Sequence, residues 1–179
     1  VADGLAAMAG VFRVVSFGAT AFEFARRGDG AGLLRFGGVF PPEHDIEVMR
    51  ALGAAFPAAG LRLDPNAAWS VEQAIRVGQA IEGLNNDYFE DPTWGLEGMR
   101  AVRQQVRIPL ATNMYPNKFD DLGPAIRMDA VDIVLTDLHY WEGPRGVKDL
   151  CAVCRTFNLG VAMHSGAEFG VELAAMIHT

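Results

Sequence analysis

Five polar residues mark the places in this chain where chemistry could occur, because each stands at the end of a short apolar run. They are Asp64, Glu90, Asn113, Asp137 and His164. Neighbours in the series lie about 25 residues apart, the length of one strand-plus-helix unit. The first three carry oxygen atoms suited to a hard divalent cation. The last two combine a carboxylate with a histidine that could transfer a proton.

The segments between these residues alternate between strand and helix patterns. Strands are predicted at 32–36, 60–64, 86–91, 108–113, 130–137 and 159–164, and helices at 41–57, 70–84, 96–106, 118–128, 143–158 and 168–179. This alternation implies βαβ crossovers and a parallel sheet. Parallel strands of a barrel place their carboxyl ends around one mouth, so the five polar residues are expected to meet there.

Six strand–helix units fall short of the eight that close a TIM-type barrel, which needs about 250 residues. The predicted fold class is therefore α/β, a partial TIM-type (β/α) barrel over residues 31–179 with strands missing at both ends. Two sheet edges are then expected to be unpaired. Residues 1–30 give no clear pattern and form an unassigned N-terminal segment. One further helix is expected within it.

The chain has 179 residues, half of them hydrophobic, and a formal net charge of −7. Its length suits one domain, and its negative charge argues against binding to nucleic acid or to an anionic membrane. No transmembrane span is predicted, and the N-terminal apolar stretch, interrupted by Arg13, is a poor match to a signal peptide. A cytoplasmic location is therefore expected.

Cys151 and Cys154 stand in C-x-x-C spacing, which is compatible with a redox pair or half of a zinc site. The sequence contains no second cysteine pair, and the flanking pattern is helical. The favoured interpretation is two small apolar residues on one helix face.

Longer segments around the five polar residues resemble the glucarate dehydratase family, in the mandelate racemase branch of the enolase superfamily. They are LRLDPNAAWS, NNDYFEDPTWGLEGM, RIPLATNM, AVDIVLTDLHYW and GVAMHS, and the resemblance extends over residues 37–179. It implies the C-terminal barrel domain of that superfamily, a Mg²⁺ cofactor and a hydro-lyase, a carbon–oxygen lyase of carbohydrate acid catabolism. D-glucarate, a hexarate, would lose the proton alpha to a carboxylate and then water, giving a keto-deoxy-glucarate.

The resemblance also implies a role for each matching residue. Mg²⁺ would be held by Asp64, Glu90 and Asn113, and His164 with Asp137 would form the catalytic dyad. The substrate-binding positions that match are Asp64, Pro65, Asn66, Asn113, His164, Ser165 and Gly166. His139 and Tyr140 follow Asp137 and either line the mouth or pack the loop.

The chain departs from the family pattern at a pair of lysines on the second barrel strand, where Leu34 and Phe36 stand instead. The family's lid domain and last strand also have no counterpart. With His164 as the one base left, epimerisation to L-idarate is expected to be lost. Three alternatives stay open: an inactive fragment, a subunit that needs a completing chain or forms a homo-oligomer, and another acid-sugar dehydratase or racemase of the superfamily.

Overall fold

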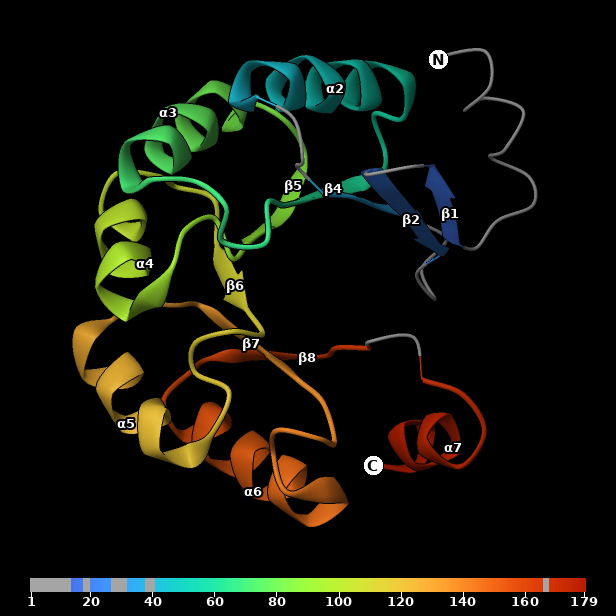
Figure 1. Ribbon diagram of the computed structural model, residues 1–179, viewed down its shortest axis with the longest axis vertical. Coiled ribbons are helices and arrows are strands. Elements are labelled where there is room, and N and C mark those ends of the chain that lie inside the picture. The colour runs from blue at the N-terminus through green and yellow to red at the C-terminus, as the bar shows by residue number, and fades with distance from the viewer. Residues whose placement is uncertain (1–13, 18–19, 27–31, 38–40, 166–167) are drawn as a thin grey trace.

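One sheet runs through the chain in sequence order (Figure 1). The computed structural model describes residues 14–17, 20–26, 32–37, 41–165 and 168–179, with side chains described from residue 41 onward. The eight strands within these residues are β1 (Val14–Phe17), β2 (Thr20–Arg26), β3 (Gly32–Gly37), β4 (Gly60–Asp64), β5 (Asn86–Glu90), β6 (Leu110–Thr112), β7 (Ile133–Thr136) and β8 (Gly160–Met163). From β3 to β8 every neighbouring pair is parallel.

A helix follows each of these parallel strands. The helices are α2 (Pro42–Ala55), α3 (Val71–Ile81), α4 (Gly95–Arg103), α5 (Phe119–Met128), α6 (Gly143–Thr156) and α7 (Val171–His178). In Figure 1, α2 to α6 form an outer arc around the strands, as in part of a barrel. The predicted α/β class and the partial-barrel architecture are confirmed.

Local sequence explains where these helices begin. Ser70 caps α3 because its side chain accepts the N–H of Gln73, while the Gln73 side chain accepts the N–H of Ser70 at 3.0 Å. This reciprocal capping box satisfies backbone donors that the first turn leaves free. α2 begins at Pro42, whose fixed φ and missing N–H suit a first helical position.

The strands present two different faces, and this alternation positions the site. Leu61, Leu63 and Phe89 face outward and pack with the helices in the main core. Tyr88, Ala111 and Leu135 form a separate buried cluster on the inner face, with Ala162 packed against it. Successive side chains of a strand point to opposite faces. The residues two positions further along therefore share this inner face, and they include Glu90, Asn113, Asp137 and His164.

The expectation of a helix in residues 1–30 is wrong for the part that the structure describes. Residues 14–17 and 20–26 form the antiparallel pair β1–β2, and β2 pairs with β3 through partners such as Phe22 and Phe36. The edge before β3 is therefore paired, contrary to prediction. The physical reason is the period of the sequence: Phe22 and Phe24 flank Glu23, an alternation that suits a strand and not a helix.

The opposite end of the sheet is exposed. β8 is the last strand of the sheet in the described residues, and Val161 and Met163 on it are exposed. α7 has no buried residue, and Phe169, Val171 and Ile177 are open to solvent. The predicted unpaired edge is therefore found at this end. Within the described ranges, no helix combines the length and apolar character that spanning a membrane would require.

The two cysteines lie on α6, as predicted, and both are free thiols. Cys154 is buried in the core between α6 and the sheet, whereas Cys151 is exposed, so only one of the two is an apolar core residue. Burial raises the pKa of the Cys154 thiol to about 11, and the nearby Cys151 adds to that increase. A reactive thiol requires the opposite shift, so the structural interpretation is favoured.

Candidate functional site

Two acidic side chains lie next to each other at the carboxyl ends of adjacent strands. Asp64 is the last residue of β4 and Glu90 the last of β5, and they are 2% and 1% exposed. The parallel register pairs Leu63 with Phe89, so these two acids occupy the next position on both strands. Asp64 also accepts the N–H of Asn66 at 2.8 Å through Oδ1, which holds its carboxylate at the start of the loop.

Asn113 stands at the end of β6, the strand next to β5, and contacts one of these two acids. It follows β6 directly, and its Nδ2 donates to Oε1 of Glu90 at 3.4 Å. The side chains of Asp64, Glu90 and Asn113 therefore come from three consecutive strand ends, and two of them are in contact. Carboxylate and amide oxygens are the ligand types that Mg²⁺ prefers.

A carboxylate and an imidazole meet at the next two strand ends. Asp137 follows β7 and is 3% exposed, and His164 follows β8. His164 Nδ1 lies 3.4 Å from Asp137 Oδ2, an ion-pair distance without aligned hydrogen-bond geometry. Contacts of this kind are often long in unliganded sites and tighten with substrate. The N–H of Tyr140 donates to Asp137 Oδ1 at 2.9 Å, which fixes the orientation of the carboxylate.

Sequence reasoning assigned no role to Asp91, which is 2% exposed and stands beside Glu90. Its carboxylate accepts hydrogen bonds from the Thr112 hydroxyl and from the N–H of Asn113. Burial raises the pKa of Asp91 to about 7, the Asp64 carboxylate adds to the increase, and these hydrogen bonds oppose it. The sequence does carry a signal for Asp91, because two acids, Glu90 and Asp91, stand together at a strand end. Alternation along the strand directs only one of these two side chains to the inner face.

The other predicted substrate-binding residues differ in exposure. Pro65 is buried, whereas Asn66 is exposed and has a left-handed backbone with φ of +52°. Ser165 is exposed, and its hydroxyl donates to Glu168 at 2.5 Å. Gly166 lies outside the described residues.

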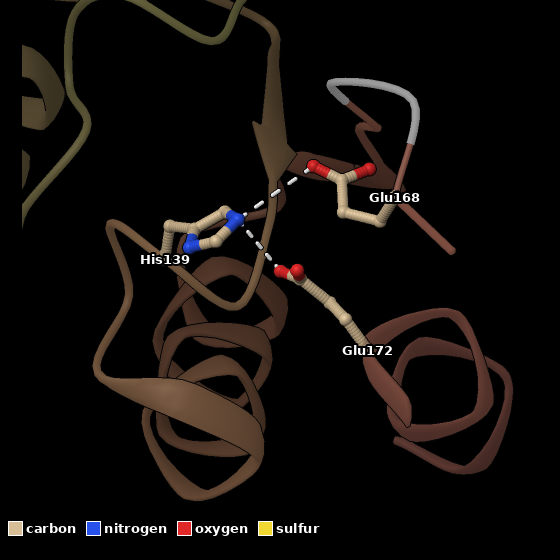
Figure 2. Close-up of side chains that lie close together, drawn as sticks. All are labelled: His139, Glu168 and Glu172. Atoms are coloured by element: carbon tan, nitrogen blue, oxygen red, sulfur yellow. Dashed lines mark ion pairs between the residues drawn. The ribbon is translucent and has the colours of Figure 1, made fainter. Parts of the chain in front are cut away.

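A second group of ionisable side chains lies beyond the His164 strand end. Figure 2 shows His139 directing Nε2 toward two carboxylates, Glu172 Oε1 at 2.7 Å and Glu168 Oε1 at 3.8 Å. Among the described residues, this is the one set of three or more His, Cys, Asp or Glu groups whose ligand atoms lie within 4.8 Å of one another. Exposed acidic groups of this kind are common without a metal ion, and the 2.7 Å contact links the loop after β7 to α7.

Comparison with known proteins agrees with this architecture. The sequence profile of the family described as Enolase C-terminal domain-like matches residues 7–179. A probable glucarate dehydratase from Streptomyces coelicolor is 49% identical over 142 residues, which cover 79% of this chain and 33% of that protein. The chain thus spans about a third of the length of this curated relative.

Two solved structures show the same fold. The crystal structure of an isomerase from Streptomyces coelicolor A3(2) has a TM-score of 0.77 at 45% identity, covering 79% of this chain and 38% of that one. An enolase from Gibberella zeae PH-1, complexed with magnesium, formate and sulfate, has a TM-score of 0.75 at 47% identity, covering 78% of this chain and 33% of that one. With its parallel strands, its outer helices and its profile match, the chain belongs to the Enolase C-terminal domain-like family.

Proposed function

We propose that this chain carries the catalytic mouth of a Mg²⁺-dependent acid-sugar dehydratase that removes water from D-glucarate. One observation carries the proposal: five consecutive strand ends present two acids, an amide, and then a carboxylate facing an imidazole at 3.4 Å. The similarity to a probable glucarate dehydratase supports this choice of substrate. The chain covers about a third of that relative, so dehydration of D-glucarate is a proposal for this chain.

The donor set fits a hard divalent cation. Asp64 and Glu90 offer two buried carboxylates, and three protein ligands leave octahedral positions for water and substrate oxygens. Asn113 would present Oδ1 after rotation of its amide, since its Nδ2 now faces Glu90. The Gibberella enolase, which shares this fold, was solved with magnesium. A bound Mg²⁺ would stabilise the negative charge that develops on a substrate carboxylate.

His164 performs the proton transfers in this proposal. Nδ1 faces Asp137, so Nε2 is the nitrogen available to the substrate. Nε2 takes the proton alpha to the carboxylate, and the C–H electron pair stays on the substrate. The hydroxyl on the neighbouring carbon then leaves with the proton returned by the imidazolium, so the net loss is one water. Asp137 stabilises the imidazolium between the two transfers.

Proton transfer would occur on one face of the substrate. The lysine pair expected from the family resemblance is replaced by Leu34 and Phe36, which leaves His164 as the base. We therefore expect turnover of the epimer that presents its proton to His164, with no conversion to L-idarate. Proton exchange at the α-carbon of both epimers would contradict this assignment.

The proposal is tested by incubating the chain with D-glucarate and Mg²⁺ and measuring keto-acid formation. We expect keto acid from the unaltered chain, loss of product when Mg²⁺ is removed with EDTA, and partial or no turnover of other acid sugars. A panel that includes galactarate distinguishes D-glucarate from related substrates. Equal keto-acid formation with and without Mg²⁺ would contradict the proposal.

The expected compartment is the cytoplasm, in keeping with two free thiols.

A second candidate is a subunit that becomes active only when another chain completes it, or an inactive fragment. The exposed apolar residues of β8 and α7, together with Leu34 and Phe36, favour this candidate. It predicts metal binding without keto-acid formation by the chain alone. Sedimentation analysis of the chain would show whether it forms a homo-oligomer.

A further inference from the structure

Asp91 connects three neighbouring strand ends through its backbone. Its carbonyl oxygen accepts the N–H of Ala67, in the loop after β4, at 2.7 Å. Its own N–H donates to the carbonyl oxygen of Ala111 on β6 at 2.9 Å. Asp91 itself directly follows β5. The three strand ends at which Asp64, Glu90 and Asn113 stand are therefore joined at this one residue.

The side chain of Asp91 extends this connection to the segment that carries Asn113. One carboxylate oxygen accepts the Thr112 hydroxyl, and the other accepts the N–H of Asn113 at 3.0 Å. Thr112 Oγ1 in turn accepts the N–H of Met114 at 3.0 Å and that of Tyr115 at 2.9 Å. One carboxylate thus determines, directly or through Thr112, the direction of three consecutive backbone N–H groups.

The Asp91 carboxylate is not placed to act as a ligand in the mouth. Both of its oxygens already accept hydrogen bonds from the β6 segment, and the residue is 2% exposed. Its backbone has φ of +35°, a strained conformation for a residue with a Cβ. Such strain persists where the surrounding structure fixes it, and it is common at functional sites.

We propose that Asp91 is a positioning residue that sets the orientation of Asn113 for binding a divalent cation. This inference rests on the proposed function, since it requires Asn113 to be a metal ligand. Changes to groups that orient metal ligands typically weaken metal affinity about 10- to 100-fold.

Asp91→Asn tests the role with a side chain of the same shape. An amide offers one acceptor in place of two, so its NH₂ must face either the Asn113 N–H or the already occupied Thr112 hydroxyl. We expect Mn²⁺ affinity, measured by electron paramagnetic resonance of the free ion, to fall about 10- to 100-fold. Thr112→Val removes the hydroxyl and is expected to weaken binding in the same direction. Thr112→Ser keeps the hydroxyl, and its Mn²⁺ affinity is expected to match that of the unaltered chain.

Asp45→Asn is the matched control, because Asp45 is an equally buried aspartate that lies on a helix, α2, and has no hydrogen bond to the Asp91 and Thr112 network in the described residues. Its Mn²⁺ affinity should equal that of the unaltered chain. The unfolding temperature in EDTA separates the two kinds of role: a purely structural Asp91 would lower that temperature and leave the affinity of the folded chain unchanged. Thr112→Val and Thr112→Ser keep the test decisive even where Asp91→Asn does not fold.

Two outcomes would overturn the inference in distinguishable ways. Loss of Mn²⁺ binding in Asp64→Ala, with undiminished binding in Asp91→Asn and Thr112→Val, would reject the role of Asp91 and leave the proposed function intact. Absence of Mn²⁺ binding in the unaltered chain would reject both.

Discussion

His164 Nδ1 lies 3.4 Å from Asp137 Oδ2, and the other oxygen of that carboxylate accepts the Tyr140 N–H at 2.9 Å. The imidazole and the carboxylate come from adjacent strand ends, whereas Tyr140 comes from the loop after β7. The Asp137 carboxylate is therefore held by a hydrogen bond through one oxygen and faces the imidazole with the other. Its orientation depends on the conformation of that loop as much as on the sheet.

His164→Asn is expected to reduce α-proton exchange of D-glucarate in deuterated water by about 10²-fold or more, because the amide cannot accept the proton. The reaction is followed by nuclear magnetic resonance. His178→Asn, at the exposed end of α7, is the matched control and should exchange at the rate of the unaltered chain. Equal exchange in both variants would remove His164 from the mechanism.

Gly146→Ala should disturb the loop that holds Asp137. A Cβ at Gly146 would lie 1.8 Å from the carbonyl oxygen of Trp141, so the backbone must move. Overpacking of this kind costs about 1–3 kcal/mol of unfolding free energy. Trp141 is buried against Phe119, which limits the room for relaxation. Keto-acid formation should fall together with stability.

Gly123→Ala on α5 is the matched control for that change. The nearest atom to its added Cβ is the flexible end of Arg127, at 3.4 Å. Alanine is favoured over glycine within a helix by about 1 kcal/mol, so this variant should be unchanged or slightly more stable. Urea unfolding measures both variants, and equal stability of Gly146→Ala and the unaltered chain would refute the close contact.

Asp45 should make stability depend on pH. Burial raises its pKa from 3.8 to about 6, with His44 acting in the opposite direction, and neither oxygen has a hydrogen-bond partner in the described part of the chain. The folded state therefore retains a proton that the unfolded chain releases near pH 4. The associated stability is present below that pH and is lost as the pH rises through about 6.

Asp45→Asn removes this titration. Relative to the unaltered chain, the variant should gain about 1–3 kcal/mol of unfolding free energy between pH 4 and pH 7. Urea unfolding at both pH values gives this difference, and comparison with the unaltered chain cancels the contributions of all other groups. A difference that does not change with pH would show that Asp45 is not a buried, proton-retaining carboxyl.

The parallel strands and their helices could be predicted from sequence because their apolar periodicity is strong. Boundaries were less accurate: β6 covers 110–112 where 108–113 was predicted, and α4 ends at Arg103 where the pattern continued to 106. The hairpin before β3 could not be predicted from apolar content alone, because the strand signal there is the short alternation around Glu23.

The spacing of polar strand ends predicted five neighbouring strand-end residues, of which Asn113 contacts Glu90 and His164 lies beside Asp137. The catalytic and metal-binding roles of all five remain predictions. Asp91 could not be identified in this way, because its role depends on hydrogen bonds to the backbone of another strand. The contact between His139 and Glu172 was equally hidden, since it depends on where α7 lies relative to the loop after β7.

Thermal unfolding during titration with Mg²⁺ tests the central claim most directly. A ligand that binds only the folded chain raises stability by about 2.7 kcal/mol at a concentration 100 times its dissociation constant. We predict a Mg²⁺-dependent rise in unfolding temperature for the unaltered chain, and loss of that rise in Asp64→Ala and in Glu90→Ala. A rise of the same size in all three proteins, or no rise in any of them, would contradict a magnesium site at these strand ends.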